Sequence, residues 1–248
     1  MIWYYILTFF AQTIEGFAGF GSTAMALPFL AIAIGTSEAV ALLSLNSLVS
    51  GGAICLMNLK QVNRREYLKI TLCVLPFIPA GILLYSTLAR YEAVLKLILG
   101  LTVVFAGARG AWYAFVKKQE PPALGKLASY AALFAGALVQ GMFNAGGPLI
   151  VLYANEQLRD KGSFRATMTA LWFTLNTLGL ALRLLITDMY TGRTFFTFAE
   201  CLPVLALGIL IGMLLHKRID NARFKQGVYL IMLAGGLLSV VYCLMGLL

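Results

Sequence analysis

The sequence predicts an all-α, polytopic membrane protein made of two inverted repeats, each a re-entrant helical hairpin followed by three transmembrane helices. Three observations lead to this fold class. Of the 248 residues, 60% are hydrophobic and only 12% are charged, which is far more apolar than a soluble domain. Apolar runs of about 20 residues, the length that crosses a bilayer, recur along the chain. Two glycine-rich motifs, at 15–28 and 140–148, interrupt such runs in the two halves.

Apolar runs between polar connections define the expected elements. Each half begins with a segment that a glycine-rich motif breaks, and three uninterrupted spans follow. The broken segments are 2–35 and 127–159, and the spans are 38–59, 68–89, 93–115, 166–187, 197–216 and 224–246. The longest polar connection, around Pro121 and Pro122, separates the halves. The predicted units are a first membrane repeat over 1–116, a cytoplasmic linker over 117–126 and a second membrane repeat over 127–248.

Residues that recur in the same order in both halves indicate an internal duplication. The matching pairs include Gly16 with Gly141, Gly21 with Gly146, Asn46 with Asn176 and Pro76 with Pro203. The offset between partners drifts only from 125 to 130 positions. Apolar sequences share residues by chance, so the evidence for duplication is the preserved order rather than any single pair.

The length of chain after each motif predicts a hairpin. Only short apolar stretches follow, from Thr23 to Ile34 and from Pro148 to Arg159. As helices of about 12 residues they would be roughly 18 Å long, whereas the hydrocarbon core is about 30 Å thick. We therefore expect each broken segment to enter and leave on one face, rather than to cross the membrane once.

The basic residues predict the orientation. If each broken segment returns to the side that it enters from, fifteen of the 19 lysines and arginines lie on one face. The other four, Arg90, Lys96, Arg183 and Arg193, lie on the opposite face. A single crossing by each segment would instead divide them ten to nine. Because basic loops stay in the cytoplasm, the first division favours inverted repeats with both termini outside.

Composition argues against several classes of function. The net charge of +9 comes from basic loops between apolar runs, so we expect no nucleic-acid partner. The four cysteines form no CxxC pattern, and His216 is the only histidine. This sequence has no paired carboxylates in its spans and no HExxH motif, so we expect no enzyme, metal site or cofactor.

The two glycine-rich motifs are the predicted binding site. Broken backbone at membrane depth frees polar groups that find no water, and paired breaks in two halves point to a transporter's binding site. The helices after the breaks should begin at Ser22 or Thr23, with a Ser/Thr cap, and at Gly147 or Pro148, with a first-turn proline. Two helix N-termini then direct N–H groups and positive partial charge at one point near the membrane midplane, which suits a small anion.

The expected site residues come from both motifs and from the spans. Glycines let the backbone approach the ligand, and hydroxyl and amide groups add neutral donors. Arg183, seven residues after Asn176 on the same helical face, would attract the anion from the outer side. The predicted substrate-binding residues are Gly16, Gly19, Gly21, Ser22, Thr23, Asn46, Gln140, Gly141, Asn144, Gly146, Gly147, Asn176 and Arg183. Plainer roles stay open: helix packing for the glycines, interhelical hydrogen bonds for Asn46 and Asn176, and snorkelling for Arg183.

Glu15 is the candidate residue for proton coupling. It is the one acid deep in an early apolar segment, and the matching position in the second half holds Gln140. Ionisable groups inside a membrane are expensive and usually functional. The sequence shows no basic partner for Glu15 nearby.

These motifs resemble those of the sulfite exporter TauE/SafE family, over essentially the whole chain. The resemblance rests on Glu15 to Gly21 with Leu27-Pro28, on Gln140 to Pro148, and on Phe164-Arg165-Ala166-Thr167 at the start of the next span. Ser22-Thr23 stands where the family usually has more glycine, and Pro148 directly follows the glycines. Both departures leave the substrate open.

The resemblance implies secondary transport of a small sulfur-containing or organic anion, such as sulfite, a sulfonate or sulfoacetate, across a bacterial inner membrane. The expected partners are this anion and the lipid bilayer, and a homo-oligomer with a second copy of the chain stays open. An anion channel and a non-transporting membrane subunit are the alternatives. The direction of transport and the coupling ion stay open.

Overall fold

The computed structural model describes residues 2–119, 125–158, 160–216 and 221–247, and every regular element in these ranges is helical. Pro121, Pro122, Arg159, Lys217 and Arg218, which entered the linker and loop-charge predictions, lie outside the described residues. The elements are α1 (Ile2–Ala18), α2 (Ser22–Ile34), α3 (Thr36–Asn58), η1 (Leu59–Gln61), α4 (Arg64–Val74), α5 (Phe77–Leu88), α6 (Glu92–Ala111), η2 (Trp112–Lys117), α7 (Lys126–Phe143), α8 (Gly147–Gln157), α9 (Lys161–Ile186), α10 (Gly192–His216) and α11 (Asn221–Leu247).

The apolar helices agree with a membrane protein. Within the described ranges, six stretches are long and apolar enough to cross a bilayer. They are Thr36–Gln61, Arg64–Leu88, Ala93–Lys117, Lys126–Phe143, Gly162–Ile186 and Gly192–His216. The prediction of an all-α polytopic membrane protein is confirmed.

One predicted span is wrong in detail. The segment 68–89 was expected as an uninterrupted helix, but it consists of α4 and α5, which are separated by Leu75 and Pro76. Proline has no N–H and its ring clashes with the preceding turn, so the helix breaks there. The matching Pro203 lies inside the continuous helix α10. The two halves therefore differ at this pair.

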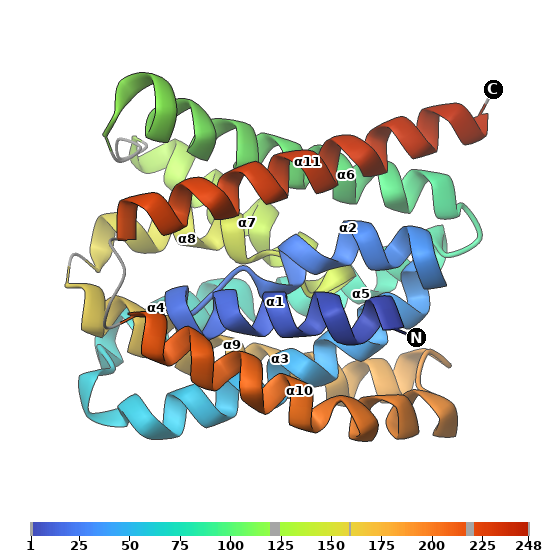
Figure 1. Ribbon diagram of the computed structural model, residues 1–248, viewed down its shortest axis with the longest axis horizontal. Coiled ribbons are helices and arrows are strands. Elements are labelled where there is room, and N and C mark those ends of the chain that lie inside the picture. The colour runs from blue at the N-terminus through green and yellow to red at the C-terminus, as the bar shows by residue number, and fades with distance from the viewer. Residues whose placement is uncertain (1, 120–124, 159, 217–220, 248) are drawn as a thin grey trace.

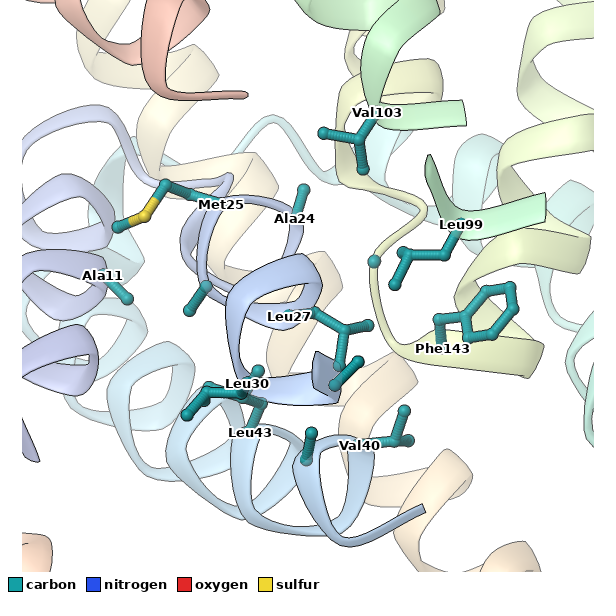
Figure 2. Close-up of a cluster of buried hydrophobic side chains, with 14 of the residues drawn as sticks. Ala11, Ala24, Met25, Leu27, Leu30, Val40, Leu43, Leu99, Val103 and Phe143 are labelled. Atoms are coloured by element: carbon teal, nitrogen blue, oxygen red, sulfur yellow. The ribbon is translucent and has the colours of Figure 1, made fainter. Parts of the chain in front are cut away.

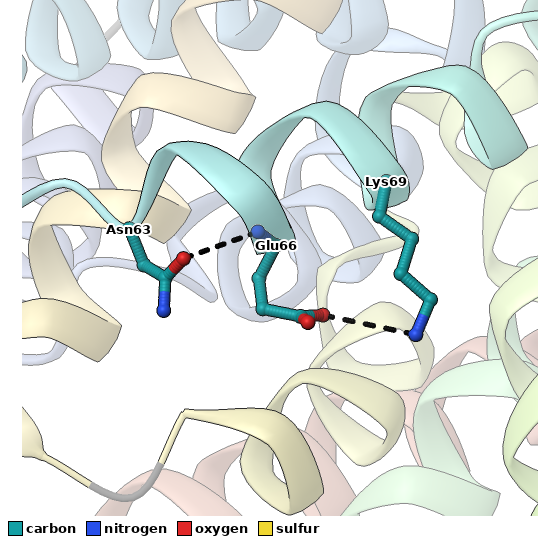
Figure 3. A network of polar contacts seen from close by, with 3 residues as sticks. All are labelled: Asn63, Glu66 and Lys69. Atoms are coloured by element: carbon teal, nitrogen blue, oxygen red, sulfur yellow. Dashed lines mark hydrogen bonds and ion pairs between the residues drawn. The ribbon is translucent and has the colours of Figure 1, made fainter.

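The start of α4 has a capping side chain (Figure 3). The side-chain oxygen of Asn63 accepts a hydrogen bond of 3.2 Å from the backbone N–H of Glu66. The backbone N–H of Asn63 donates to the hydroxyl of Thr167 on α9, at 2.9 Å. Glu66 and Lys69 form an ion pair at 4.0 Å, which contributes little to stability because it is long and partly exposed. The cap and the Thr167 contact fix the α3–α4 connection against α9.

Each half contains a helical hairpin at its start (Figure 1). Helix α2 runs back toward the end of the molecule at which α1 begins, and α8 runs back toward the end at which α7 begins. Helices α1 and α7 begin at opposite ends of the long axis. Helix α11 ends near the end at which α1 begins.

The four helix pairs with the most extensive contacts are α6 with α11, α1 with α10, α3 with α9, and α5 with α7. Close glycine contacts allow two of these pairs to form. A Cβ on Gly16 would lie 2.6 Å from the carbonyl oxygen of Ile209 in α10. A Cβ on Gly141, the matching residue, would lie 2.5 Å from the carbonyl oxygen of Ile78 in α5. Such small residues let membrane helices approach closely.

The largest hydrophobic cluster surrounds α2 (Figure 2). Leu27 and Leu30 of α2 are fully buried, as are Val40 of α3, Leu99 of α6 and Phe143 of α7. Alanines at 24, 26 and 31 let neighbouring helices lie close to α2. The short helix after the first glycine-rich motif is therefore enclosed by protein.

Candidate functional site

The first break, residues 19–21, joins α1 to α2 and depends on two glycines. Gly19 has φ 78° and Gly21 has φ 95°, a left-handed conformation that side chains rarely adopt. Helix α2 begins at Ser22, as predicted. The predicted Ser/Thr cap is wrong: Gly21 is the N-cap residue, with no side-chain cap bond. The Ser22 hydroxyl instead donates to the carboxylate of Glu15.

The second break, residues 144–146, joins α7 to α8. Asn144 is left-handed, with φ 58°, and α8 begins at Gly147 with Pro148 in its first turn, as predicted. The backbone N–H of Gly146 donates to Oε1 of Gln140 at 3.0 Å. A Cβ on Gly146 would lie 2.0 Å from the carbonyl oxygen of Gly136, so this position requires glycine for packing.

The two breaks meet at one small cavity. A Cβ on Gly147 would lie 4.0 Å from the backbone nitrogen of Gly21, so the starts of α8 and α2 face each other closely. The cavity has a volume of about 20 Å³, which suffices for roughly one water molecule. Its lining includes residues of both breaks and of α3 and α9: Glu15, Phe20, Gly21, Ser22, Thr23, Ala24, Ser47, Gln140, Asn144, Ala145, Gly147, Pro148, Trp172 and Asn176.

Neutral donors predominate among the polar groups of the cavity. The hydroxyls of Thr23 and Ser47 lie 2.9 Å apart. The amide of Gln140 donates to the side-chain oxygens of Asn144, at 2.9 Å, and Asn176, at 3.0 Å. Nδ2 of Asn144 is buried and has no hydrogen-bond partner among the described residues. A buried donor without a partner is destabilising, and it is therefore a candidate contact for a ligand.

Eight of the fourteen residues predicted for binding or coupling line this cavity, and six do not. Gly16 and Gly141 allow helix packing, Gly146 allows closure of its own hairpin, and the carbonyl of Gly19 accepts a bond from Trp172. Asn46 accepts from the Tyr4 hydroxyl at 3.0 Å and donates to Thr8 at 3.1 Å, which links α1 to α3. The guanidinium of Arg183 donates to backbone carbonyls of α7.

The sequence prediction missed Trp172, Ser47 and Arg165. Nε1 of Trp172 donates to the carbonyl of Gly19 at 3.0 Å, and its ring lines the cavity. The sequence could have indicated a role for Trp172. It lies in the interior of a span, one helical turn before Asn176, whereas most membrane tryptophans lie at interfaces. Arg165 donates to the carbonyl of Gly16. It belongs to the Phe164 to Thr167 motif, for which the prediction had assigned no role.

A second cavity, of about 430 Å³, lies where α2 ends and α3 begins. Its lining includes Gly35, Glu38, Tyr85, Asp188 and Arg193. The ring of Tyr85 packs edge-on against Phe143, with centroids 6.0 Å apart. Phe143 directly precedes Asn144, which lines the first cavity, and Tyr85 lines the second.

A family comparison decides which class of protein has this arrangement. The family described as sulfite exporter TauE/SafE matches residues 4–239, nearly the whole chain. The chain belongs to the sulfite exporter TauE/SafE family. Membership agrees with the prediction of a multi-pass membrane protein of a transporter family, and it is consistent with the expectation that the chain is not an enzyme.

A curated relative supports the TauE/SafE assignment. A probable inner membrane transporter protein, TsaS of Comamonas testosteroni, is 21% identical over 140 residues. The matched segment covers 56% of this chain and 57% of the relative, so the likeness spans little more than half of either protein. No solved structure matches the chain significantly.

Proposed function

We propose that this TauE/SafE protein is a secondary transporter of a small sulfur-containing or organic anion, of the sulfite, sulfonate or sulfoacetate class. The single observation that supports this most directly is the meeting of two helix N-termini, Ser22 of α2 and Gly147 of α8, at one cavity. The first N–H groups of a helix have no intrahelical partner, and the helix dipole adds positive partial charge there. Such ends bind anions without requiring a cationic side chain.

The donor set of the cavity also favours an anion. The lining offers hydroxyls, side-chain amides and the unpartnered Nδ2 of Asn144. Glu15 is the only carboxylate among the lining residues. A hard cation such as Ca²⁺ takes six to eight oxygen ligands, usually with several carboxylates, so the cavity suits a sulfur oxyanion better.

We propose that transport is by alternating access between inverted repeats, 1–116 and 127–248, joined by the linker 117–126. Two observations support the inverted repeats. The α1–α2 and α7–α8 hairpins run in opposite directions, and Gly16 of α1 and Gly141 of α7 allow close helix packing at matching positions. The first cavity holds about one water, so an anion would enter only after the helices move. A site that must open favours a transporter over the alternative of a channel.

The larger cavity is the proposed approach to the anion site from one side. In this proposal the contact between Tyr85, which lines the second cavity, and Phe143, which precedes Asn144 of the first, acts as the gate between them. Phe143 is fully buried and packs against Tyr85, as a closed gate would require. The gate would open when α7 shifts relative to α5, because these residues belong to the two helices.

We propose that Glu15 couples transport to protons. Its carboxylate is 2% exposed and accepts a hydrogen bond from Ser22 at the start of α2. Gain or loss of a proton at Glu15 would change this bond, and with it the donors available to the anion. The matching Gln140 cannot change charge, and it holds Gly146 and Asn144 in place instead.

The name of the curated relative supports a bacterial inner-membrane location for this chain. Both termini are proposed to lie outside. Arg65, Lys118, Arg90 and Arg193 are all exposed. Cysteines introduced at Arg65 and Lys118, on the proposed cytoplasmic face, should not react with an impermeant thiol reagent added to whole cells. Cysteines introduced at Arg90 and Arg193, on the proposed outer face, should react. The reverse pattern would overturn the orientation. A homo-oligomer stays a prediction, for which light scattering of the purified protein is the test.

The proposed activity is tested by uptake into proteoliposomes. We expect saturable uptake of sulfite or a short sulfonate by wild type, and loss of uptake in Ser22→Leu and in Asn176→Leu. Thr177→Leu is the matched control, because Thr177 is the next residue of α9 but is exposed and bonds only to the carbonyl of Phe173. Wild-type uptake in both site variants would overturn the site. No uptake or binding of any anion by wild type would favour the non-transporting subunit.

A further inference from the structure

Helix α9 contains two buried arginines, and no carboxylate among the described side chains forms an ion pair with either of them. The side chains of Arg165 and Arg183 are 9% and 2% exposed. Among the side chains that the structure describes, no acidic group lies within ion-pair distance of either guanidinium. Burial of a charge without a partner is expensive, so each arginine should have a specific role.

Both arginines bind the same kind of group at matching positions of the two repeats. Nη2 of Arg165 donates to the carbonyl oxygen of Gly16, in the last turn of α1. Nη2 of Arg183 donates to the carbonyl oxygens of Gly141, at 2.6 Å, and Gln140, at 3.4 Å, in the last turn of α7. The last carbonyls of a helix have no intrahelical partner. Gly16 and Gly141 are the first matched pair of the duplication.

Four side chains on one face of α9 connect it to the two breaks. Arg165 and Arg183 are eighteen positions apart, which is five helical turns, so they point the same way. Between them on this face lie Trp172, which donates to Gly19 of the first break, and Asn176, which accepts from Gln140 beside the second. Helix α9 therefore contacts both hairpins from a single face.

The directions of the helices at each break determine the electrostatic effect of the two arginines. At each break a helix N-terminus, with positive partial charge, lies close to the C-terminus of the preceding helix, which has negative partial charge. The ends of α1 and α7 would therefore repel an anion that the starts of α2 and α8 attract. Each guanidinium lies on the carbonyls that are the source of this repulsion.

We propose that Arg165 and Arg183 are paired positioning residues that mask the negative helix ends of α1 and α7, so that the two breaks present net positive potential to the anion. This inference rests on the proposed function and extends it to two residues that do not line the cavity. The masking requires the positive charge as well as a hydrogen-bond donor. Lysine keeps the charge, whereas glutamine keeps a donor and loses the charge.

The test compares Arg165→Gln, Arg165→Lys, Arg183→Gln and Arg183→Lys in proteoliposome uptake of sulfite, with thermal unfolding of each purified variant. Each glutamine variant should raise KM at least about tenfold with a smaller change in the maximal rate. Each lysine variant should stay within about threefold of the wild-type KM. Arg64→Gln, an exposed residue at the start of α4, is the control and should not change KM.

Each of the other outcomes overturns the proposal. Equal KM changes in the glutamine and lysine variants would show that the charge plays no part. A wild-type KM in the folded fraction of both glutamine variants, together with a lower unfolding temperature, would assign the arginines to folding alone. Failure of the proposed function is distinct from these outcomes, because wild type itself would then neither bind nor transport any anion.

Discussion

Replacement of Gly147 by alanine tests the cavity with a single methyl group. Gly147 begins α8 and faces Gly21 across the cavity. The added Cβ would lie 3.7 Å from the nearest atom of Trp172 and 4.0 Å from the backbone nitrogen of Gly21. These are ordinary van der Waals contacts, so the variant should fold. Gly147 does not have a positive φ, so alanine suits its backbone.

The expected effects on stability and on binding have different signs. Replacing glycine by alanine at a compatible position stabilises a protein by about 0.4–1 kcal/mol, because the unfolded chain loses freedom. The methyl group nevertheless occupies a large part of a cavity of about 20 Å³, between the two helix starts. It keeps the anion from the N–H groups of α2 and α8. We expect the Kd for sulfite to rise at least about tenfold, or about 1.4 kcal/mol.

Isothermal titration of the purified protein with sulfite measures this Kd, and thermal unfolding without ligand measures stability. Gly192→Ala is the matched control, since a Cβ there would meet nothing within 4 Å, and it should leave Kd unchanged. An unchanged Kd in Gly147→Ala would refute binding between the two breaks. A large loss of thermal stability would refute the packing on which the prediction rests.

Three further predictions concern residues near the breaks. Gly21→Ala should lower the free energy of unfolding by about 1–2 kcal/mol through backbone strain, because φ at this position is 95°. The nearest atom to the added Cβ would be 4.0 Å away, so no steric clash contributes. A denaturation midpoint equal to that of wild type would contradict this. Gln12→Met should raise the melting temperature, because both side-chain amide atoms of Gln12 are buried and have no partner among the described residues. A lower melting temperature would point to a ligand or water on that amide. Glu15→Gln should abolish the response of uptake to an imposed proton gradient in proteoliposomes, while anion binding persists. A response equal to that of wild type would show that Glu15 does not couple transport to protons.

Local rules predicted the positions of the breaks and the helices around them. Clustered glycines and Pro148 mark the places where a helix cannot continue, so the starts at Ser22 and Gly147 followed from chemistry within a few residues. The cap was wrong because Gly21 already occupies the N-cap position, and the Ser22 hydroxyl is drawn to the buried Glu15.

Partners distant in the chain could not be read from the sequence. Periodicity shows which face a residue lies on, but not which helix covers that face. Gly16 was expected near the anion and instead packs on α10, and Asn46 bonds to Tyr4 and Thr8 of α1. The contact of Arg183 with α7 likewise depends on how α9 crosses both hairpins. These contacts follow from tertiary packing alone.

The stoichiometry of anion binding tests the central claim most directly. If the two breaks form a single site, the purified protein should bind one labelled sulfite per chain. Substitution in either half, Ser22→Leu or Asn176→Leu, should abolish that one site entirely. Two sites per chain, or a half-occupied protein after substitution in one half, would show that each break binds independently and would contradict the shared site.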